Sequence, residues 1–260
     1  NIEMKWMLII SMLVAGLVPL LVTGLYALNG AEDALYKKGF DQLKSLKTVK
    51  KSQVEDYFVQ IDNQIITFSE NEMIINMMRN AKKGFHELST DLMVDKGKVA
   101  EYKSDLRQFY DNEFIRKFTK DTGDSMASGK LMPTSDTGII AQYLYISHNK
   151  NPLGSKSQLT DTKDGSRYAK IHADHHPVVL SYLEKFGYYD IFLVDHETGD
   201  LVYSVFKEID YATNLYTGPH KDSGIADVVR QAANARSKDE TYVNDFAWYV
   251  PSFNAAASFI

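Results

Sequence analysis

Residues 6–28 have the sequence WMLIISMLVAGLVPLLVTGLYAL, which contains no charged side chain. A helix needs about 20 apolar residues to cross the roughly 30 Å hydrocarbon core of a bilayer, and this run is longer. Trp6 and Tyr26 lie near its two ends, where membrane helices carry interfacial aromatic residues. Pro19 is compatible with this assignment, because neighbouring groups in a membrane helix satisfy the carbonyl that proline leaves free. The run therefore predicts a transmembrane helix.

A cleaved signal peptide is the alternative interpretation of this run. Signal peptides have a shorter apolar region, of about 7–15 residues, followed by a small-x-small cleavage site. The run is longer than that, and Ala27-Leu28-Asn29 is a poor cleavage site. Both observations favour an uncleaved anchor.

Lysines flank the run on both sides and bear on its orientation. Lys5 precedes it, and four lysines follow it: Lys37, Lys38, Lys44 and Lys47. Counted literally, the positive-inside rule keeps the following segment in the cytoplasm, but long domains cross membranes largely regardless of charge. Composition alone therefore leaves the orientation open.

The composition of the 260 residues excludes several classes of protein. Apolar residues make up 44% of the chain, which is enough for a sizeable core and excludes wholesale disorder. The net charge of −5 argues against a nucleic-acid partner. The chain has no cysteine, so a disulfide framework, a thiolate zinc site and a cysteine nucleophile are excluded.

Two helical regions follow the apolar run. Residues 31–79 contain no proline and only Gly39, and their apolar residues recur at helical spacing: Leu35, Leu43, Leu46, Val49, Val54, Tyr57, Ile61, Ile65 and Phe68. This length is typical of a dimer-forming rod, although a helix packed on its own domain remains the alternative. A second helical pattern runs from Leu88 to Phe118, and a segment rich in Gly, Ser, Asp and Pro then predicts a module boundary near residue 125.

The C-terminal half changes to β-type patterns. The runs YYDIFLV (188–194) and LVYSVF (201–206) flank a Gly-containing turn and predict a hairpin. Asp222-Ser223 begins a predicted helix over residues 224–236. Residues 241–249 and 257–260 are predicted strands. The sequence therefore predicts an α+β fold with an antiparallel sheet, and the apolar run at Ile260 suggests that the sheet is truncated there.

Residues 141–260 also carry a series of segments in a characteristic order. They are QYLYI (142–146), NPLGSK (151–156), DGSRY (164–168), His172, His176-Pro177, FGYYDIFLVD (186–195), TGD (198–200), VYSVFKE (202–208), DYATNL (210–215), Gly218-Pro219, DFAWYVPS (245–252) and ASFI (257–260). This string resembles the membrane-distal, PAS-like module of double-Cache sensor domains in bacterial methyl-accepting chemotaxis proteins. Similar sensors also occur in some histidine kinases and nucleotide cyclases.

The resemblance implies a domain organisation and a location. Residues 1–5 would be a cytoplasmic start, 6–28 the transmembrane helix, 29–125 a long helical region used for dimerisation, and 126–260 an incomplete PAS-like Cache module. The chain would be anchored in the bacterial inner membrane with its bulk in the periplasm. It would sense a small molecule as a homodimer for signal transduction, without catalytic activity, a cofactor or a bound metal.

A histidine-rich segment offers a rival, enzymatic hypothesis. On a helix, His172 and His176 share a face at the i, i+4 spacing of zinc sites, and with Asp174 they suggest a membrane-tethered metal hydrolase. No third ligand follows at a suitable spacing, and Pro177 is expected to break the run. Histidines that hydrogen-bond locally are therefore the favoured interpretation. Asp161, Asp164 and Gly165 lack the acidic spacing of a calcium loop and predict a turn.

A small-ligand pocket is the site hypothesis that we favour. Binding pockets combine aromatic walls with a few charged groups, and six residues on or beside the predicted strands have this chemistry: Tyr203, Lys207, Asp210, Tyr242, Asp245 and Trp248. Lys207 suits a ligand carboxylate and Asp245 an ammonium group. Because residues alternate between the faces of a strand, Asp245 and Trp248 cannot both point inward. The amino-acid signature of the family, an Arg followed by a Trp-Tyr pair, is not evident.

Overall fold

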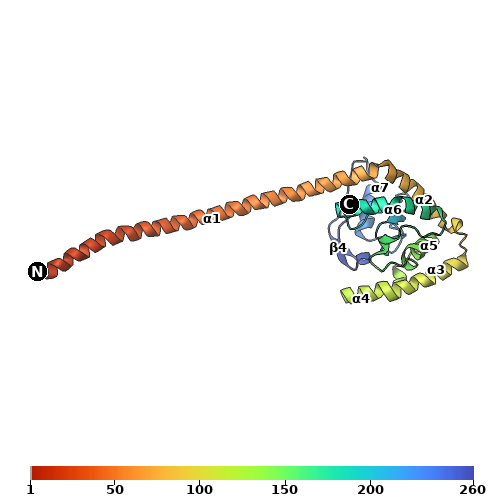
Figure 1. Ribbon diagram of the computed structural model, residues 1–260, viewed down its shortest axis with the longest axis horizontal. Helices are drawn as coiled ribbons and strands as arrows, with labels where there is room; N and C mark the ends of the chain where they lie inside the picture. Colours follow the sequence, from red (N-terminus) through yellow and green to blue (C-terminus); the bar gives the residue numbers. More distant parts are fainter. Residues whose placement is uncertain (1) are drawn as a thin grey trace. The chain divides into compact units, whose positions relative to one another are not determined.

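The computed structural model describes residues 2–260, so Asn1, the first residue of the predicted cytoplasmic start, lies outside the described residues. The chain divides into two compact units, Asn1–Gln64 and Ile65–Ile260. We call them unit 1 and unit 2 and describe each by itself. Figure 1 gives the element labels used below.

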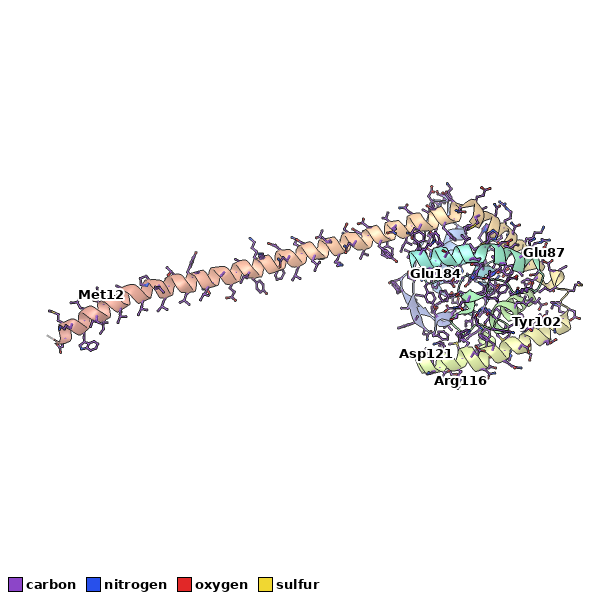
Figure 2. All side chains as sticks on the ribbon, viewed as in Figure 1. Met12, Glu87, Tyr102, Arg116, Asp121 and Glu184 are labelled. Atoms are coloured by element: carbon purple, nitrogen blue, oxygen red, sulfur yellow. The ribbon has the colours of Figure 1, made fainter. Side chains whose placement is uncertain are left out.

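Unit 1 consists of most of helix α1 (Ile2–Glu70). An 18-residue window of this helix has a mean hydropathy of 2.5, so the helix is long and apolar enough to span a membrane. Pro19 lies inside the helix, and the Thr23 hydroxyl donates to its carbonyl at 2.8 Å. Figure 2 shows the side chains around Met12 standing free of any packed neighbour. The apolar side chains of residues 6–28 are largely exposed in the single chain.

The predicted long helix ends earlier than residue 79. Asn71 has extended backbone angles, and its side chain accepts a hydrogen bond from the Met73 amide at 2.9 Å, so it ends α1 and caps α2 (Glu72–Asp91). Helix α2 packs beside α6 (Arg167–Phe186) (Figure 1). The two backbones approach closely at Gly84, where an added Cβ would lie 3.0 Å from the Tyr168 nitrogen. Pro177 lies inside α6, so the expectation that it breaks the histidine run was wrong.

The second helical region is interrupted twice. Asp95 caps α3 (Lys96–Phe109) by accepting from the Lys98 amide at 2.8 Å, so residues 92–95 form a turn instead of helix. The π-helical segment η1 (Tyr110–Ile115) then joins α3 to α4 (Arg116–Thr122), and Gly123 ends α4 at a φ of 79°. Short connecting segments follow: η2 (Ser128–Lys130), α5 (Asp136–Gln142), π-helical η3 (Tyr143–Ser147) and η4 (Lys156–Gln158).

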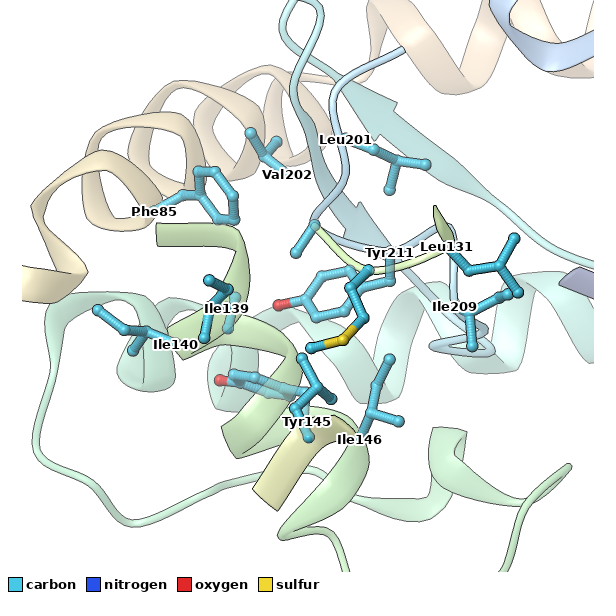
Figure 3. Close-up of a cluster of buried hydrophobic side chains, with 14 of the residues drawn as sticks. Phe85, Leu131, Ile139, Ile140, Tyr145, Ile146, Leu201, Val202, Ile209 and Tyr211 are labelled. Atoms are coloured by element: carbon cyan, nitrogen blue, oxygen red, sulfur yellow. The ribbon is translucent and has the colours of Figure 1, made fainter. Parts of the chain in front are cut away.

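One core joins the helices before residue 125 to the segments after it. Figure 3 shows Phe85 of α2, Ile139 of α5 and Val202 of β2 converging in it. Leu106 of α3 and Phe118 of α4 belong to the same cluster. The division therefore falls at residues 64 and 65 and not at the predicted boundary near 125, because both sides of that boundary share their buried apolar surface.

The C-terminal strands form two small antiparallel sheets. Strands β1 (Phe192–Val194) and β2 (Leu201–Ser204) make the predicted hairpin, with Leu193 opposite Tyr203. Helix α7 (Gly224–Ala233) follows. Strand β3 (Ala247–Tyr249), the 3-10 turn η5 (Val250–Ser252) and strand β4 (Ala255–Ala257) form the second sheet. The α+β prediction is confirmed.

Two predicted strands differ in extent from those observed. Only the last three residues of the 241–249 run are strand, and β4 ends where the final strand was expected to begin. The Asn244 amide instead donates to the Phe259 carbonyl, and the Asn244 side-chain oxygen accepts from the Phe259 amide. These two bonds join the segments without forming a regular pair of strands. Within residues 2–260, strand β3 pairs with β4 and not with β1 or β2, so the predicted single antiparallel sheet is two sheets, and the Asp245 segment and Tyr203 belong to different ones.

Candidate functional site

The six predicted site residues divide into two groups. Tyr203, Lys207 and Asp210 are each buried, at and after the end of β2. Tyr242 is partly exposed and donates to its neighbour Glu240, and the Asp245 side chain is exposed and accepts from the next amide. Trp248 is 77% exposed, whereas Tyr249 on the opposite face of β3 is 4% exposed. The structure therefore brings Tyr203 and Lys207 together, buries Asp210 against Tyr249, and leaves the other three residues outside.

A lysine lies at the centre of the buried group. The Lys207 side chain is buried, and its Nζ lies 4.9 Å from the ring centre of Tyr203, 5.7 Å from that of Tyr211 and 5.8 Å from that of Tyr145. This ammonium donates to the Ser204 carbonyl at 2.6 Å. Burial lowers the pKa of Lys207 to about 7, and the carboxylate of Asp190 opposes that effect. The three rings stabilise the cation that burial disfavours.

The backbone at Lys207 is strained. Its φ is 58°, in the left-handed region that a residue with a Cβ occupies at a cost of about 1–3 kcal/mol. The Lys207 amide donates to the Ser204 hydroxyl at 2.9 Å, which holds this turn. Strain of this kind persists where the surrounding structure over-determines a conformation, and here it places the lysine among the tyrosines.

Two histidines of α6 lie against the same tyrosines. The rings of His172 and His176 stack with centres 4.4 Å apart, and His172 lies 4.8 Å from Tyr145. Helical i, i+4 spacing puts both rings on one face, as the sequence predicts. They do not bond locally, however. His172 Nδ1 lies 2.7 Å from the Thr160 carbonyl, and His176 Nε2 lies 2.6 Å from the Ser157 carbonyl.

Carbonyl oxygens accept only, so these contacts determine which nitrogen of each ring carries hydrogen. His176 has its hydrogen on Nε2, and its Nδ1 accepts from the Tyr203 hydroxyl at 2.7 Å. His172 has its hydrogen on Nδ1, which leaves Nε2 as a bare acceptor. Burial lowers the pKa of His176 to about 3, and it lowers the pKa of His172 well below its ordinary value. The Lys207 charge acts in the same direction on both histidines, so both rings are neutral at pH 7.

Two buried polar atoms in this cluster have no hydrogen-bond partner. They are the Nε2 of His172 and the hydroxyl of Tyr145, and both side chains are essentially inaccessible to solvent. The Thr162 hydroxyl interacts with Tyr145 without forming a hydrogen bond of normal geometry, and it donates its own hydrogen to Asp164 at 2.7 Å. An unmade hydrogen bond at a buried polar group costs about 1–3 kcal/mol. The cluster is therefore incomplete as a hydrogen-bonding network.

A segment that we call the strap (residues 149–166) closes over the histidines. Its carbonyls at Ser157 and Thr160 accept from them, and Lys156 ties it internally by donating to the Asn149 carbonyl at 2.7 Å. Within the strap, Asp161 and Asp164 accept from the amides two residues ahead of them, at 2.8 and 2.7 Å. The prediction of a turn at these two residues is thereby confirmed.

Three carboxylates lie around the end of β2, and Asp190 is the one that acts on Lys207. Asp190 accepts from the Ser204 hydroxyl at 2.7 Å and from the amides of Val205 and Phe206, and burial raises its pKa to about 7. Burial also raises the pKa of Glu208, which accepts from Tyr189 and Ser252. Asp210 accepts from Tyr249, and its other oxygen is buried without a partner. Burial, Glu208 and Asp190 together raise the Asp210 pKa well above its ordinary value.

Sequence reasoning missed Tyr145, Asp190 and the inward role of the two histidines. Asp190 could have been identified from the sequence, because it directly precedes an apolar strand, and a carboxylate buried there must be paired. Asp174 is exposed, and both nitrogens of His176 are already bonded, so the predicted zinc set does not assemble. Across residues 2–260, no three His, Asp or Glu side chains form a group that could hold a metal ion.

The chain was compared with models of protein families, with characterised proteins and with solved structures, and no match was found.

Proposed function

We propose that this chain is the ligand-sensing region of a membrane-anchored signal-transduction receptor of the bacterial chemotaxis type. In this proposal α1 anchors the chain in the inner membrane and unit 2 lies in the periplasm. Support comes from the apolar helix, from the resemblance of residues 141–260 to double-Cache sensors, and from the buried polar cluster.

The buried polar cluster is the observation that carries the proposal. A domain with a purely structural role has no need of a buried lysine, two stacked histidines and buried carboxylates. Burying such groups costs free energy unless they are fully paired. Here the His172 Nε2 and the Tyr145 hydroxyl stay unpaired, and several pKa values are strongly shifted. Perturbed, incompletely paired groups of this kind gather at functional sites. A small ligand that completes the network would favour one arrangement of unit 2 over another.

The proposed signal passes through α1. A ligand shifts an equilibrium by no more than its difference in affinity for the two states. We propose that these states are two arrangements of a parallel homodimer whose contact is the apolar stripe of α1. That stripe is exposed in the single chain, for example at Leu43, Leu46 and Val49.

Two measurements test this proposal. Protease added to intact spheroplasts should digest unit 2, and protection until lysis would reverse the orientation. The whole chain in lipid nanodiscs should then be screened by thermal shift against a library of small acids, amines, amino acids and sugars. At least one compound should raise the melting temperature, and a library without any stabilising compound would refute the sensing function.

A further inference from the structure

The unpaired atoms of the buried cluster indicate the chemistry of its ligand. Lys207 has a spare N–H donor, because its ammonium has three N–H groups and, among the described residues, two carbonyl acceptors, Ser204 at 2.6 Å and Val205 at 3.5 Å. The Tyr145 hydroxyl is a second free donor. His172 Nε2 is a free acceptor, since the hydrogen of that ring is on Nδ1. A matching ligand accepts hydrogen bonds at one end and meets a basic nitrogen at the other.

We propose that Lys207, Tyr145 and His172 bind a short-chain monocarboxylate, and that binding takes up a proton onto His172 Nε2. This inference rests on the proposed sensing function and names the ligand class of the same site. One carboxylate oxygen accepts from Lys207 and Tyr145. The other oxygen accepts from the newly protonated His172, so the bound state contains one anion between two cations.

Charge and space both favour this class of ligand. A cationic ligand would meet the Lys207 ammonium, which already occupies the centre of the three tyrosine rings. A singly charged anion balances the buried lysine, and the same anion stabilises the imidazolium that forms on His172. The binding groups are themselves buried and lie against the strap, which favours a ligand of few heavy atoms.

The proton uptake follows from the groups that face His172. They are Lys207 beyond β2, His176 and Tyr168 on its own helix, Tyr145 of η3 and Tyr203 of β2. The strap adds Asp161 and Asp164, which act on Tyr145, and Asp190 acts on Lys207 from behind. Without a ligand, burial and the lysine charge keep His172 neutral. An anion bound beside Nε2 becomes the charge nearest to His172. Its negative sign favours the imidazolium form of that ring.

Acetate is the probe, and the protein is the whole chain in nanodiscs at pH 6, where Lys207 is mostly charged before binding. Acetate should raise the melting temperature, whereas acetamide and methylammonium should not. Calorimetry in two buffers of different ionisation enthalpy should show uptake of close to one proton. From pH 6 upward the apparent Kd should weaken by about tenfold per pH unit because of the His172 proton, and more steeply above pH 7, where free Lys207 has also lost its proton.

Variants separate the roles of the residues. Lys207→Met should weaken acetate binding at least about tenfold, as expected for a lost charged hydrogen bond. His172→Asn should bind more weakly and without proton uptake, whereas His196→Asn, at an exposed position, should behave as the parent does. Should the two buried variants fail to fold, nitrogen NMR of the parent decides, because acetate must convert one buried imidazole from an acceptor Nε2 to a protonated one.

Three results would overturn the inference: acetamide binding as tightly as acetate, acetate binding without proton uptake, or His172→Asn retaining the uptake. If carboxylates fail but a compound of another class stabilises the chain, this inference is wrong and the sensing function stands. If no compound in the library stabilises the chain, both are wrong.

Discussion

The substitution His176→Gln should make the chain less sensitive to acid. The glutamine amide can donate to the Ser157 carbonyl and accept from the Tyr203 hydroxyl, so it keeps both contacts of the histidine without its titration. The pKa of His176 is about 3 in the folded chain, against about 6.5 in an unfolded one. A folded-state pKa that is lowered in this way means that the unfolded state binds more protons, so stability is lost as pH falls below about 6.5.

The magnitude follows from the two pKa values. At pH 7 both states are mostly neutral, whereas at pH 5 only the unfolded state is protonated. His176 alone should therefore lower the free energy of unfolding by about 2 kcal/mol between pH 7 and pH 5. His172 acts in the same direction, and Asp190 acts in the opposite one because its pKa is raised to about 7. These contributions are common to parent and variant, so they cancel in the comparison.

The assay is urea unfolding in nanodiscs, followed by circular dichroism at several pH values. The parent should lose about 2 kcal/mol more than His176→Gln between pH 7 and pH 5. His196→Gln, at an exposed histidine, should follow the parent. Equal losses in the parent and in His176→Gln would show that His176 is not held neutral by its surroundings, and the reasoning would fail.

Three further predictions concern the dimer, the packing and the site. A cysteine at Leu46 should crosslink two chains, since the chain has no other thiol; no crosslink at any position from 46 to 52, about two helical turns, would exclude the α1 dimer. Gly138→Ala should lower the free energy of unfolding by about 1–3 kcal/mol, because its Cβ would lie 2.4 Å from the Ala212 carbonyl oxygen, whereas Gly39→Ala should be tolerated because its Cβ would meet nothing within 4 Å. Asp245→Ala should leave acetate binding unchanged because that side chain is exposed, and a tenfold loss of affinity would restore our original assignment of Asp245 to the site.

Local pattern was sufficient for the elements whose signals act over a few residues. The uncharged run at 6–28 predicts a helix because its length matches a bilayer, and α1 includes it. The β1–β2 hairpin follows from two β-rich runs around a turn. The side-chain chemistry of Tyr203, on that hairpin, and of Lys207, just after it, predicts that both are site residues, and both are buried in the cluster.

Tertiary structure decided which polar groups meet. His172 and His176 share a face by helical spacing alone, but their partners Thr160, Ser157 and Tyr203 come from segments 12, 19 and 27 residues away. Local spacing contains no information about such contacts, because they form only when α6, β2 and the strap pack on one core. The exposure of Asp245 has the same origin: strand alternation predicts which side chains share a face, but only the packing of a sheet determines which face is buried.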